Sequence, residues 1–320
     1  MFTTITLNPC IDKTIFVPCF KFGDLNHISR SKMVIAGKGF NVSKGIARLG
    51  FQTIATGFLY SSDSKDAIQQ LENEVPGKIT VDCIVCPGHL RVNTKVFDEQ
   101  TRTVTGLNEP GVETNENYVS QIIEKVGQMA ALSNFLIMSG SLPPKCPQDI
   151  YLRIIKHVLN MKVECKIVLD ASGAALAAVF ENNNLAMPYL IKPNRDEFCS
   201  LINKTIDSID DFKSEAIKLI HEKGIKIICI SLDSQGALIT NGEESYFAPP
   251  VKDIIVKGTV CAGDSMVAGL VTGLYNELSL KDAFQRSVAS ATACVIQEAS
   301  SVVTNELLME ILPRVEIQSI

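Results

Sequence analysis

The chain has 320 residues, of which 46% are hydrophobic and 20% charged, a composition typical of globular proteins rather than of disordered or fibrous ones. Its 30 lysines and arginines against 35 aspartates and glutamates give a net charge of −5, which argues against a nucleic-acid-binding surface. No apolar run approaches the roughly 18 residues that a membrane span needs, and the first residues read as a strand rather than a secretory signal, so we expect a cytoplasmic protein.

The chain opens with a strand-like run at Thr3–Leu7, and a second follows at Ile54–Leu59. Between them a glycine turn, Ala36–Ser43, precedes a helix that we predict to end near Leu49. The turn is not a Walker A loop, because no Gly-Lys-Ser/Thr follows. Lys38 and Asn41, beside the flexible Gly37 and Gly39, could bind a sugar or its phosphate, or the segment could form an ordinary solvated turn.

Two stretches, Asn26–Ile35 and Cys83–Leu107, contain successive short strands with no helix between them. Within the second, Arg91–Asp98 and Thr101–Thr105 alternate in the manner of a β-hairpin. Together the two stretches predict a small β insertion whose polar side chains face either a ligand or water.

Ten cysteines are scattered singly, mostly in apolar segments, which indicates reduced and buried thiols rather than a disulfide framework. The one close pair, Cys83 and Cys86, would need a second pair of ligands to bind a metal. Both cysteines lie in a strand-like run, so we interpret them as structural.

The rest of the chain alternates strands with helices, an order that predicts a parallel sheet covered by helices on both faces. We predict strands at Phe135–Met138, Lys166–Leu169, Tyr189–Ile191 and Ile227–Leu232, with helices at Tyr118–Leu132 and Ile150–Leu159. Polar turns follow three of these strands, at Ser139–Ser141, Asp170–Gly173 and Ser231–Ala237. Because ligands bind beyond the carboxyl ends of parallel strands, these turns together predict one cleft, although each alone fits an ordinary turn.

The segment Ile191–Phe198 leaves a predicted strand and enters a helix, and it contains Lys192, Asn194 and Glu197. Asn194 and Glu197 are three residues apart, so both can face the same side of a first helical turn. Their oxygens could hold a hydrated Mg²⁺. The same residues also fit an ordinary helix N-cap followed by acidic first-turn residues.

The most informative stretch is Gly258–Gly269, a turn of small residues that leads into an apolar helix predicted to continue to about Tyr275. The first amides of a helix lack internal partners and lie at the positive end of its dipole, so a phosphoryl group can bind there. Asp264 at this place is either a helix-capping residue or a general base. The flanking small residues, which let a ligand approach the backbone, favour the base.

These motifs, in this order along nearly the whole chain, resemble those of the ribokinase-like (PfkB) carbohydrate kinases. They are Thr4–Pro9 with Asp12, Gly37–Val42, Ser139–Pro143, Lys192–Glu197 and Ala262–Gly269. The resemblance implies an α/β fold: a ribokinase-like three-layer α/β/α core with a mostly parallel sheet and a small β-sheet lid. Residues 1–320 would form a single kinase domain, with the lid built from insertions at about 12–35 and 85–108.

The resemblance also implies transfer of the γ-phosphate of ATP to a hydroxyl of a phosphorylated ketohexose, with ATP and Mg²⁺ required. Asp264 would accept the hydroxyl proton, and the amides of Ala262, Gly263 and Asp264 would hold the transferring phosphoryl group, with a further N–H supplied by Cys261. Substrate binding is implied for Asp12, Gly37, Lys38, Gly39, Asn41, Arg91 and Ser139, with the substrate phosphate assigned to Lys38, Arg91 and Ser139. Nucleotide binding is implied for Lys192, Asn194, Ser231, Gly236, Val260 and Gly263, and Mg²⁺ binding through water for Asn194 and Glu197.

Within the family, the segments Arg91–Lys95 and Leu107–Gly111 resemble most the members that convert fructose 1-phosphate to fructose 1,6-bisphosphate. Tagatose 6-phosphate and fructose 6-phosphate are the alternative substrates, and a catalytically silent sugar-phosphate sensor is the alternative of another class. A ribose or nucleoside kinase fits less well, because Lys38 and Arg91 suit a phosphorylated substrate. The lid would exclude water from the sugar and could carry a homodimer contact, with no nucleic-acid or membrane partner.

Two residues depart from the family pattern, because Cys261 and Asp233 stand where the family usually has glycine. If the position of Cys261 needs a positive φ, its side chain is strained by about 1 kcal/mol or more. A thiol at a helix N-terminus also predicts a lowered pKa at Cys261, with easier oxidation that would block ATP. Asp233 would repel nucleotide phosphates unless its side chain points away.

Overall fold

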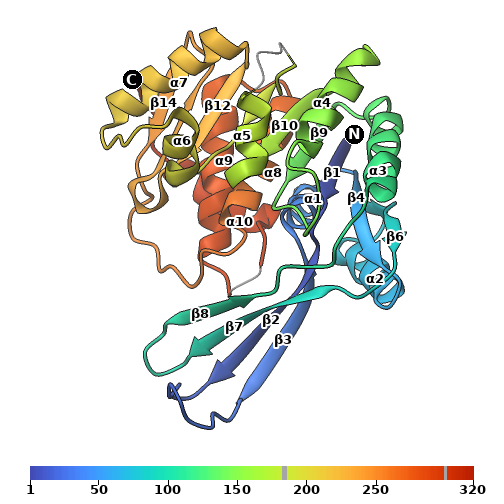
Figure 1. The fold of residues 1–320 in the computed structure, drawn as a ribbon. Coiled ribbons are helices and arrows are strands. Elements are labelled where there is room, and N and C mark those ends of the chain that lie inside the picture. Colours follow the sequence, from blue (N-terminus) through green and yellow to red (C-terminus); the bar gives the residue numbers. More distant parts are fainter. Residues whose placement is uncertain (182–185, 299–300) are drawn as a thin grey trace.

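The computed structural model describes residues 1–181, 186–298 and 301–320, and within them the chain forms two separate sheets (Figure 1). The order of strands in the larger sheet is β15-β14-β13-β12-β11-β10-β9-β1-β4-β5, and β6 also pairs with β4. These strands are β1 (Phe2–Thr6), β4 (Thr53–Tyr60), β5 (Ile79–Val81), β6 (Ile84–Cys86), β9 (Phe135–Ser139), β10 (Lys166–Asp170), β11 (Leu190–Ile191), β12 (Ile227–Ser231), β13 (Ala237–Thr240), β14 (Ser245–Ala248) and β15 (Gln318–Ser319).

In the larger sheet the neighbouring strands β5, β4, β1, β9, β10, β11 and β12 run parallel to one another, which confirms the mostly parallel sheet predicted from the sequence. The antiparallel edge formed by β13, β14 and β15 was not predicted. Between β12 and β13 the chain makes only a short 3₁₀ turn, Asp233–Gln235, followed by Gly236 at a φ of 106°. So short a connection can join only antiparallel strands, because a parallel crossover needs a dozen or more residues.

Helices cover both faces of the larger sheet (Figure 1). On one face lie α2 (Ser64–Glu74), α3 (Glu116–Ala130), α4 (Ile150–Asn160), α5 (Gly173–Phe180), α6 (Arg195–Ile202) and α7 (Ile209–Lys223), and on the other α1 (Lys38–Arg48), α8 (Ala262–Tyr275), α9 (Leu280–Val295) and α10 (Asn305–Ile311). Successive strand residues point to opposite faces. Thus Leu136 of β9 joins the first core and Ile137 the second, and the molecule has the three layers expected of this fold class.

The smaller sheet has the strand order β3-β2-β7-β8, and it extends away from the main body (Figure 1). Its strands are β2 (Cys10–Val17), β3 (Arg30–Ala36), β7 (Arg91–Asp98) and β8 (Val104–Asn108). The predicted hairpin is confirmed, since β7 and β8 pair antiparallel with Asn93 opposite Asn108. The first insertion begins with β2, slightly earlier than predicted, because β2 continues almost directly from β1.

Cys83 lies between β5 and β6 and Cys86 ends β6, so the predicted strand-like run is broken at Cys83; both thiols are free. Burial raises the pKa of the Cys86 thiol to about 11, which suits an inert structural residue. In the part of the chain that the structure describes, no group of three or more His, Cys, Asp or Glu side chains is arranged to hold a metal ion. Within the same residues, no helix is both long and apolar enough to cross a bilayer.

The start of α1 packs unusually close to β1, and this contact depends on glycine. A Cβ placed on Gly39 would lie 2.3 Å from the Ile5 carbonyl oxygen and 2.5 Å from Thr6 Oγ1. Gly37, the N-cap of α1, has a φ of 138°, and its Cβ would lie 2.5 Å from Thr6 Cγ2. The glycines of this turn therefore set how deeply the helix docks on the sheet.

We predict that Gly39→Ala lowers the free energy of unfolding by about 3 kcal/mol, because the added methyl group meets backbone that cannot move away. Gly106→Ala in β8 is the matched control, since nothing lies within 4 Å of a Cβ at that position. Denaturant unfolding of both variants measures the difference. Equal stabilities for the two variants would contradict the proposed close packing.

Candidate active site

Two helix N-termini meet at the centre of the candidate site, one from α1 and one from α8. Asn41 Nδ2 donates a hydrogen bond to Asp264 Oδ2 at 2.8 Å, joining residues 223 positions apart in the chain. The helices also touch further along, where a Cβ on Gly45 would lie 2.9 Å from the Ala268 Cβ. The glycine turn and the small-residue turn that the sequence singled out separately thus form one site.

The beginning of α8 offers backbone donors to an anion. Cys261 is its N-cap, and Gly263 and Asp264 follow in the first turn, where amides have no acceptor within the helix. The Ala262 amide donates to the Thr259 carbonyl at 3.3 Å, so it is partly engaged. A Cβ on Gly263 would lie 3.4 Å from Lys192 Nζ, which places that ammonium beside the helix start. The positive end of the dipole and the lysine both favour a bound phosphoryl group.

Asp264 is 5% exposed, and its Oδ2 accepts the hydrogen bond from Asn41 of α1. A helix-capping carboxylate would instead accept from amides of its own helix, so this geometry favours a reactive group. Burial raises the pKa of its carboxyl to about 6, and the nearby Lys38 ammonium opposes this shift. A carboxyl with a pKa close to neutral can accept a proton and release it again. Asp264 therefore has the properties of a general base.

Asp170 is a central residue of the site that the sequence indicated only as part of a polar turn after a strand. It is 1% exposed at the end of β10 and accepts a hydrogen bond from Ser139 Oγ at 2.9 Å. Its carboxylate lies 3.3 Å from Lys192 Nζ and 3.6 Å from Lys38 Nζ. Burial alone would raise the pKa of Asp170, but Lys192 and Lys38 hold it down at about 2. Asp170 thus stays ionised and holds two cations from different segments beside α8.

Lys38 and Ser139, both assigned to the substrate phosphate by the sequence, lie together at Asp170. The Lys38 side chain is 41% exposed, and the Asp170 carboxylate raises the pKa of its ammonium. It thus keeps a positive charge that an incoming anion can reach. The Ser139 hydroxyl is buried and donates to Asp170, so in this structure it orients that carboxylate.

Asn194 and Glu197 form a capping box at the start of α6. Asn194 Oδ1 accepts from the Glu197 amide, and Glu197 Oε2 accepts from the Asn194 amide, both at 2.8 Å. The ordinary N-cap interpretation is therefore present in the structure. Glu197 still has a second carboxylate oxygen and influences the Lys38 ammonium electrostatically. That oxygen is compatible with a hydrated Mg²⁺, which keeps most of its waters and binds few carboxylates.

Of the other residues assigned to the nucleotide, Ser231 and Gly236 lie near the end of β12 and Val260 lies before α8. Ser231 ends β12 and forms a β-bridge with Asn194, which brings these two together. Gly236 follows β12 with its Cα packed against the Ala248 carbonyl, where a Cβ would come within 2.0 Å. Val260 precedes the start of α8, and its carbonyl accepts from the Cys294 thiol at 3.3 Å.

The polar residues predicted in the insertion face one another across β2 and β7. Lys95 Nζ donates to Asp12 Oδ2 at 2.6 Å, and Asn93 Nδ2 lies 3.2 Å from the Cys10 sulfur. Arg91 donates to the backbone carbonyls of Glu109 at 2.8 Å and of Asn8 at 3.1 Å. The Arg91 guanidinium thus fastens the root of the smaller sheet in this structure, and its assignment to the substrate phosphate stays a prediction.

The two departures from the family pattern both adopt a left-handed backbone, with a φ of 65° at Cys261 and 51° at Asp233. The positive φ considered for Cys261 is confirmed, and Asp233 has the same left-handed conformation, which was not predicted. The expected lowering of the Cys261 pKa is wrong: burial, and then the Asp264 carboxylate, raise the pKa of this thiol well above its ordinary value. Desolvation of a 7% exposed thiol outweighs the helix dipole. Easy oxidation at Cys261 is therefore not expected.

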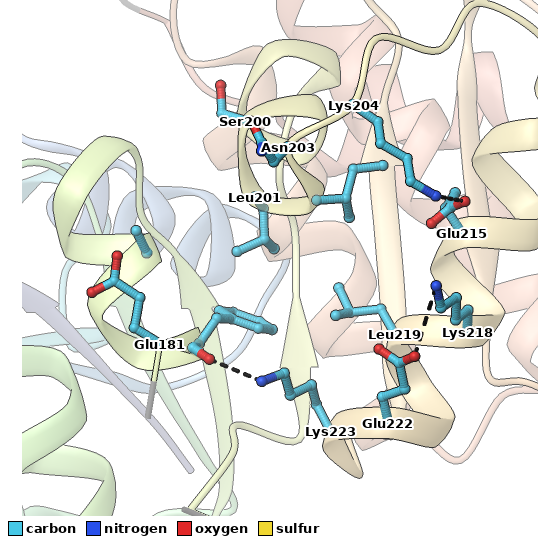
Figure 2. A pocket seen from close by; sticks show the side chains of 13 residues that line it. Glu181, Ser200, Leu201, Asn203, Lys204, Glu215, Lys218, Leu219, Glu222 and Lys223 are labelled. Carbon is cyan, nitrogen blue, oxygen red and sulfur yellow. Dashed lines mark hydrogen bonds and ion pairs between the residues drawn. The ribbon is translucent and has the colours of Figure 1, made fainter. Parts of the chain in front are cut away.

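A cavity of about 440 Å³ lies elsewhere, between α5, α6 and α7 (Figure 2). Four of its charged side chains form two ion pairs, since Lys204 binds Glu215 and Lys218 lies 3.8 Å from Glu222. Lys223 donates to the Phe180 carbonyl at 2.9 Å. Because each of its three lysines already has a partner and none of its lining residues belongs to the predicted site, this cavity does not resemble a phosphate-binding cleft.

Comparisons with known proteins agree with this geometry. A family model described as pfkB family carbohydrate kinase matches residues 5–306. The chain is 32% identical to the 1-phosphofructokinase of Escherichia coli K12 over 98% of this chain and 97% of that protein. It is 30% identical to the 1-phosphofructokinase of Bacillus subtilis over 99% of both. It also resembles the solved structure of E. coli phosphofructokinase-2 in complex with fructose-6-phosphate, with a TM-score of 0.87, 25% identity and 98% of each chain covered.

We predict that Asp264→Asn stabilises the protein above neutral pH and not in acid. The carboxyl pKa is raised from 3.8 to about 6 on folding, so its favourable contribution is present below pH 3.8 and is lost as the pH rises through about 6. Asparagine does not ionise. The variant should therefore exceed the native protein by up to about 3 kcal/mol near pH 8 and match it near pH 4.

Denaturant unfolding at several pH values measures this gap, and Asp66→Asn, at an exposed carboxylate on α2, controls for the chemical change. A gap that stays constant with pH would show that the Asp264 carboxyl is not destabilised by burial.

Proposed function

The chain belongs to the pfkB family of carbohydrate kinases, and we propose that it phosphorylates fructose 1-phosphate to fructose 1,6-bisphosphate with ATP as the donor. It is a sugar-phosphate kinase, a phosphotransferase that acts on an alcohol group. The observation that carries the proposal is the buried Asp264 carboxylate in the first turn of α8, with Lys38 and Lys192 held nearby by Asp170.

The chemistry follows from these groups. Asp264 accepts the proton of the sugar hydroxyl while the oxygen of that hydroxyl attacks the γ-phosphorus of ATP. The bond from this phosphorus to the oxygen that bridges the β- and γ-phosphates breaks, and ADP is released. The first-turn amides of α8 and the Lys192 and Lys38 ammonium groups stabilise the charge on the transferring phosphoryl group. Asn41, bonded to Asp264, keeps the carboxylate oriented toward the acceptor.

A bound Mg²⁺ would neutralise phosphate charge and help to align the nucleotide. Glu197 is the residue that fits it, through water and with the oxygen left over from the capping box. Asn194 contributes by holding Glu197 at the start of α6.

The choice of fructose 1-phosphate is supported by two 1-phosphofructokinase relatives of about full length, at 32% and 30% identity. Fructose 6-phosphate is a second candidate, because the similar phosphofructokinase-2 structure holds that sugar. Tagatose 6-phosphate is a third. A silent sensor is disfavoured by Asp264, since binding alone would not require a buried carboxylate with a raised pKa.

We also propose that the smaller sheet acts as a lid over the sugar and carries a homodimer contact. Large apolar side chains are exposed in the single chain on this sheet, at Met33, Val104 and Leu107, and on the connection between β2 and β3, at Phe20, Phe22, Leu25 and Ile28. Exposed apolar patches of this kind mark interaction surfaces. A second copy of the chain would cover them.

We predict ADP release with fructose 1-phosphate at a higher kcat/KM than with fructose 6-phosphate or tagatose 6-phosphate. Asp264→Asn should lower kcat about 10³-fold while substrate binding persists, because it removes the proton acceptor. Asp66→Asn serves again as the control and should retain native kcat. Turnover of none of the three sugars, or native kcat in Asp264→Asn, would contradict the proposed function.

For the dimer, we predict that replacing Phe22 (98% exposed) and Leu25 (78% exposed) together by serine shifts the protein from dimer to monomer. Sedimentation velocity measures the change. Leu159→Ser, at a 44% exposed leucine on α4, is the control and should leave the dimer intact. A native chain that sediments as a monomer at all concentrations would refute this contact.

A further inference from the structure

Lys44 is a buried cation that the proposed reaction does not use. It lies on α1 and is 6% exposed. Its Nζ donates to the carbonyl oxygen of Ile35 at 2.5 Å. Burying an ammonium group costs free energy unless the group is hydrogen-bonded, so a lysine at such a place needs a reason beyond packing.

The partner of Lys44, Ile35, is held from two sides. It is the next-to-last residue of β3, where the smaller sheet joins α1. While Lys44 of α1 binds its carbonyl, its amide donates to Gln70 Oε1 of α2 at 2.8 Å. Because β3 is an edge strand, these outward-facing backbone groups have no neighbouring strand to pair with. Two side chains of the main body thus hold one residue at the root of the smaller sheet.

Helix α1 is itself firmly attached to the main body. The Ser43 hydroxyl lies 2.7 Å from Thr4 Oγ1 of β1 and 3.1 Å from Thr53 Oγ1 of β4. One turn before Lys44, Asn41 binds Asp264. The same rigid helix therefore contacts the candidate base at one point and the smaller sheet at another.

We propose that Lys44 is a positioning residue, which fixes the root of the smaller sheet at Ile35 to the helix that orients Asp264. The smaller sheet then closes over the sugar about a fixed point at Ile35. Its polar side chains are thereby placed at a defined position relative to the Asp264 carboxylate. This inference rests on the proposed kinase function and on the lid role of the smaller sheet. Lys44 does not contact the reacting atoms, so its effect is on sugar binding and on exclusion of water.

The test compares Lys44→Met, which keeps the length of the side chain without the donor, with Lys44→Arg, which restores a donor. Hydrogen exchange without any substrate is measured first. In Lys44→Met, amides of β2, β3 and β7 should exchange about tenfold faster, as for loss of a hydrogen bond from a charged group, while β9 and β10 stay unchanged. Ile46→Val, a buried change on the same helix without a bond to the smaller sheet, should leave exchange in that sheet unchanged.

Kinetics provide the second readout. Lys44→Met should raise KM for the sugar phosphate about tenfold with kcat changed less than about threefold, and should raise ATP hydrolysis in the absence of sugar. Lys44→Arg should recover part of the loss. A merely structural lysine would lower stability without this split between KM and kcat.

Gln70→Met keeps the proposal testable if Lys44→Met does not fold, because Gln70 is a surface residue that holds Ile35 from the other side. It should produce the same loosening of the smaller sheet to a smaller degree. Unchanged exchange in the smaller sheet in Lys44→Met, or in Gln70→Met where that is the variant that folds, would overturn the fixed point at Ile35. A native protein that turns over none of the sugar phosphates would instead refute the proposed function, and the exchange result would still decide whether Lys44 and Gln70 hold the smaller sheet.

Discussion

The hydrogen bond between Asn41 and Asp264 is the contact on which the rest of the site depends. It joins the first turns of α1 and α8, whose positive ends would otherwise repel each other, through a buried carboxylate. That contact requires α1 to lie deep against β1, which only glycine at position 39 permits. The close packing of α1 on β1, the hydrogen bond to the Asp264 carboxylate and the anion site at the start of α8 therefore depend on one another.

Charge balance around this contact comes from Asp170. A second buried carboxylate near Asp264 is unfavourable by itself, yet it binds Lys38 and Lys192, so two positive charges accompany it. The two acids are driven in opposite directions: burial dominates at Asp264 and raises its pKa, whereas the lysines dominate at Asp170 and lower its pKa. One carboxylate is left able to exchange a proton and the other stays ionised.

Most of the fold could be predicted because its signals are local. Runs of apolar β-branched residues predicted the central strands, and the helical spacing of apolar residues predicted the bounds of α3 and α4 to within a few residues. The antiparallel edge at β13 escaped prediction, because a three-residue 3₁₀ turn leaves no periodic pattern. At the candidate site, the motifs identified Asp264 and Asn41 as separate residues, but Asp170 and Lys44 stood in segments that look like an ordinary turn and an ordinary amphipathic helix.

What the sequence by itself determined was the class of fold, the small insertion and the residue types available for phosphoryl transfer. It also indicated that Cys261 and Asp233 stand where glycine is usual, and both have a positive φ. Only the tertiary structure decided which charges meet and which groups lose water. The Cys261 pKa illustrates the reason: a helix dipole can be inferred from local sequence, whereas desolvation depends on residues such as Cys294 and Val302 that fold over the thiol from far along the chain.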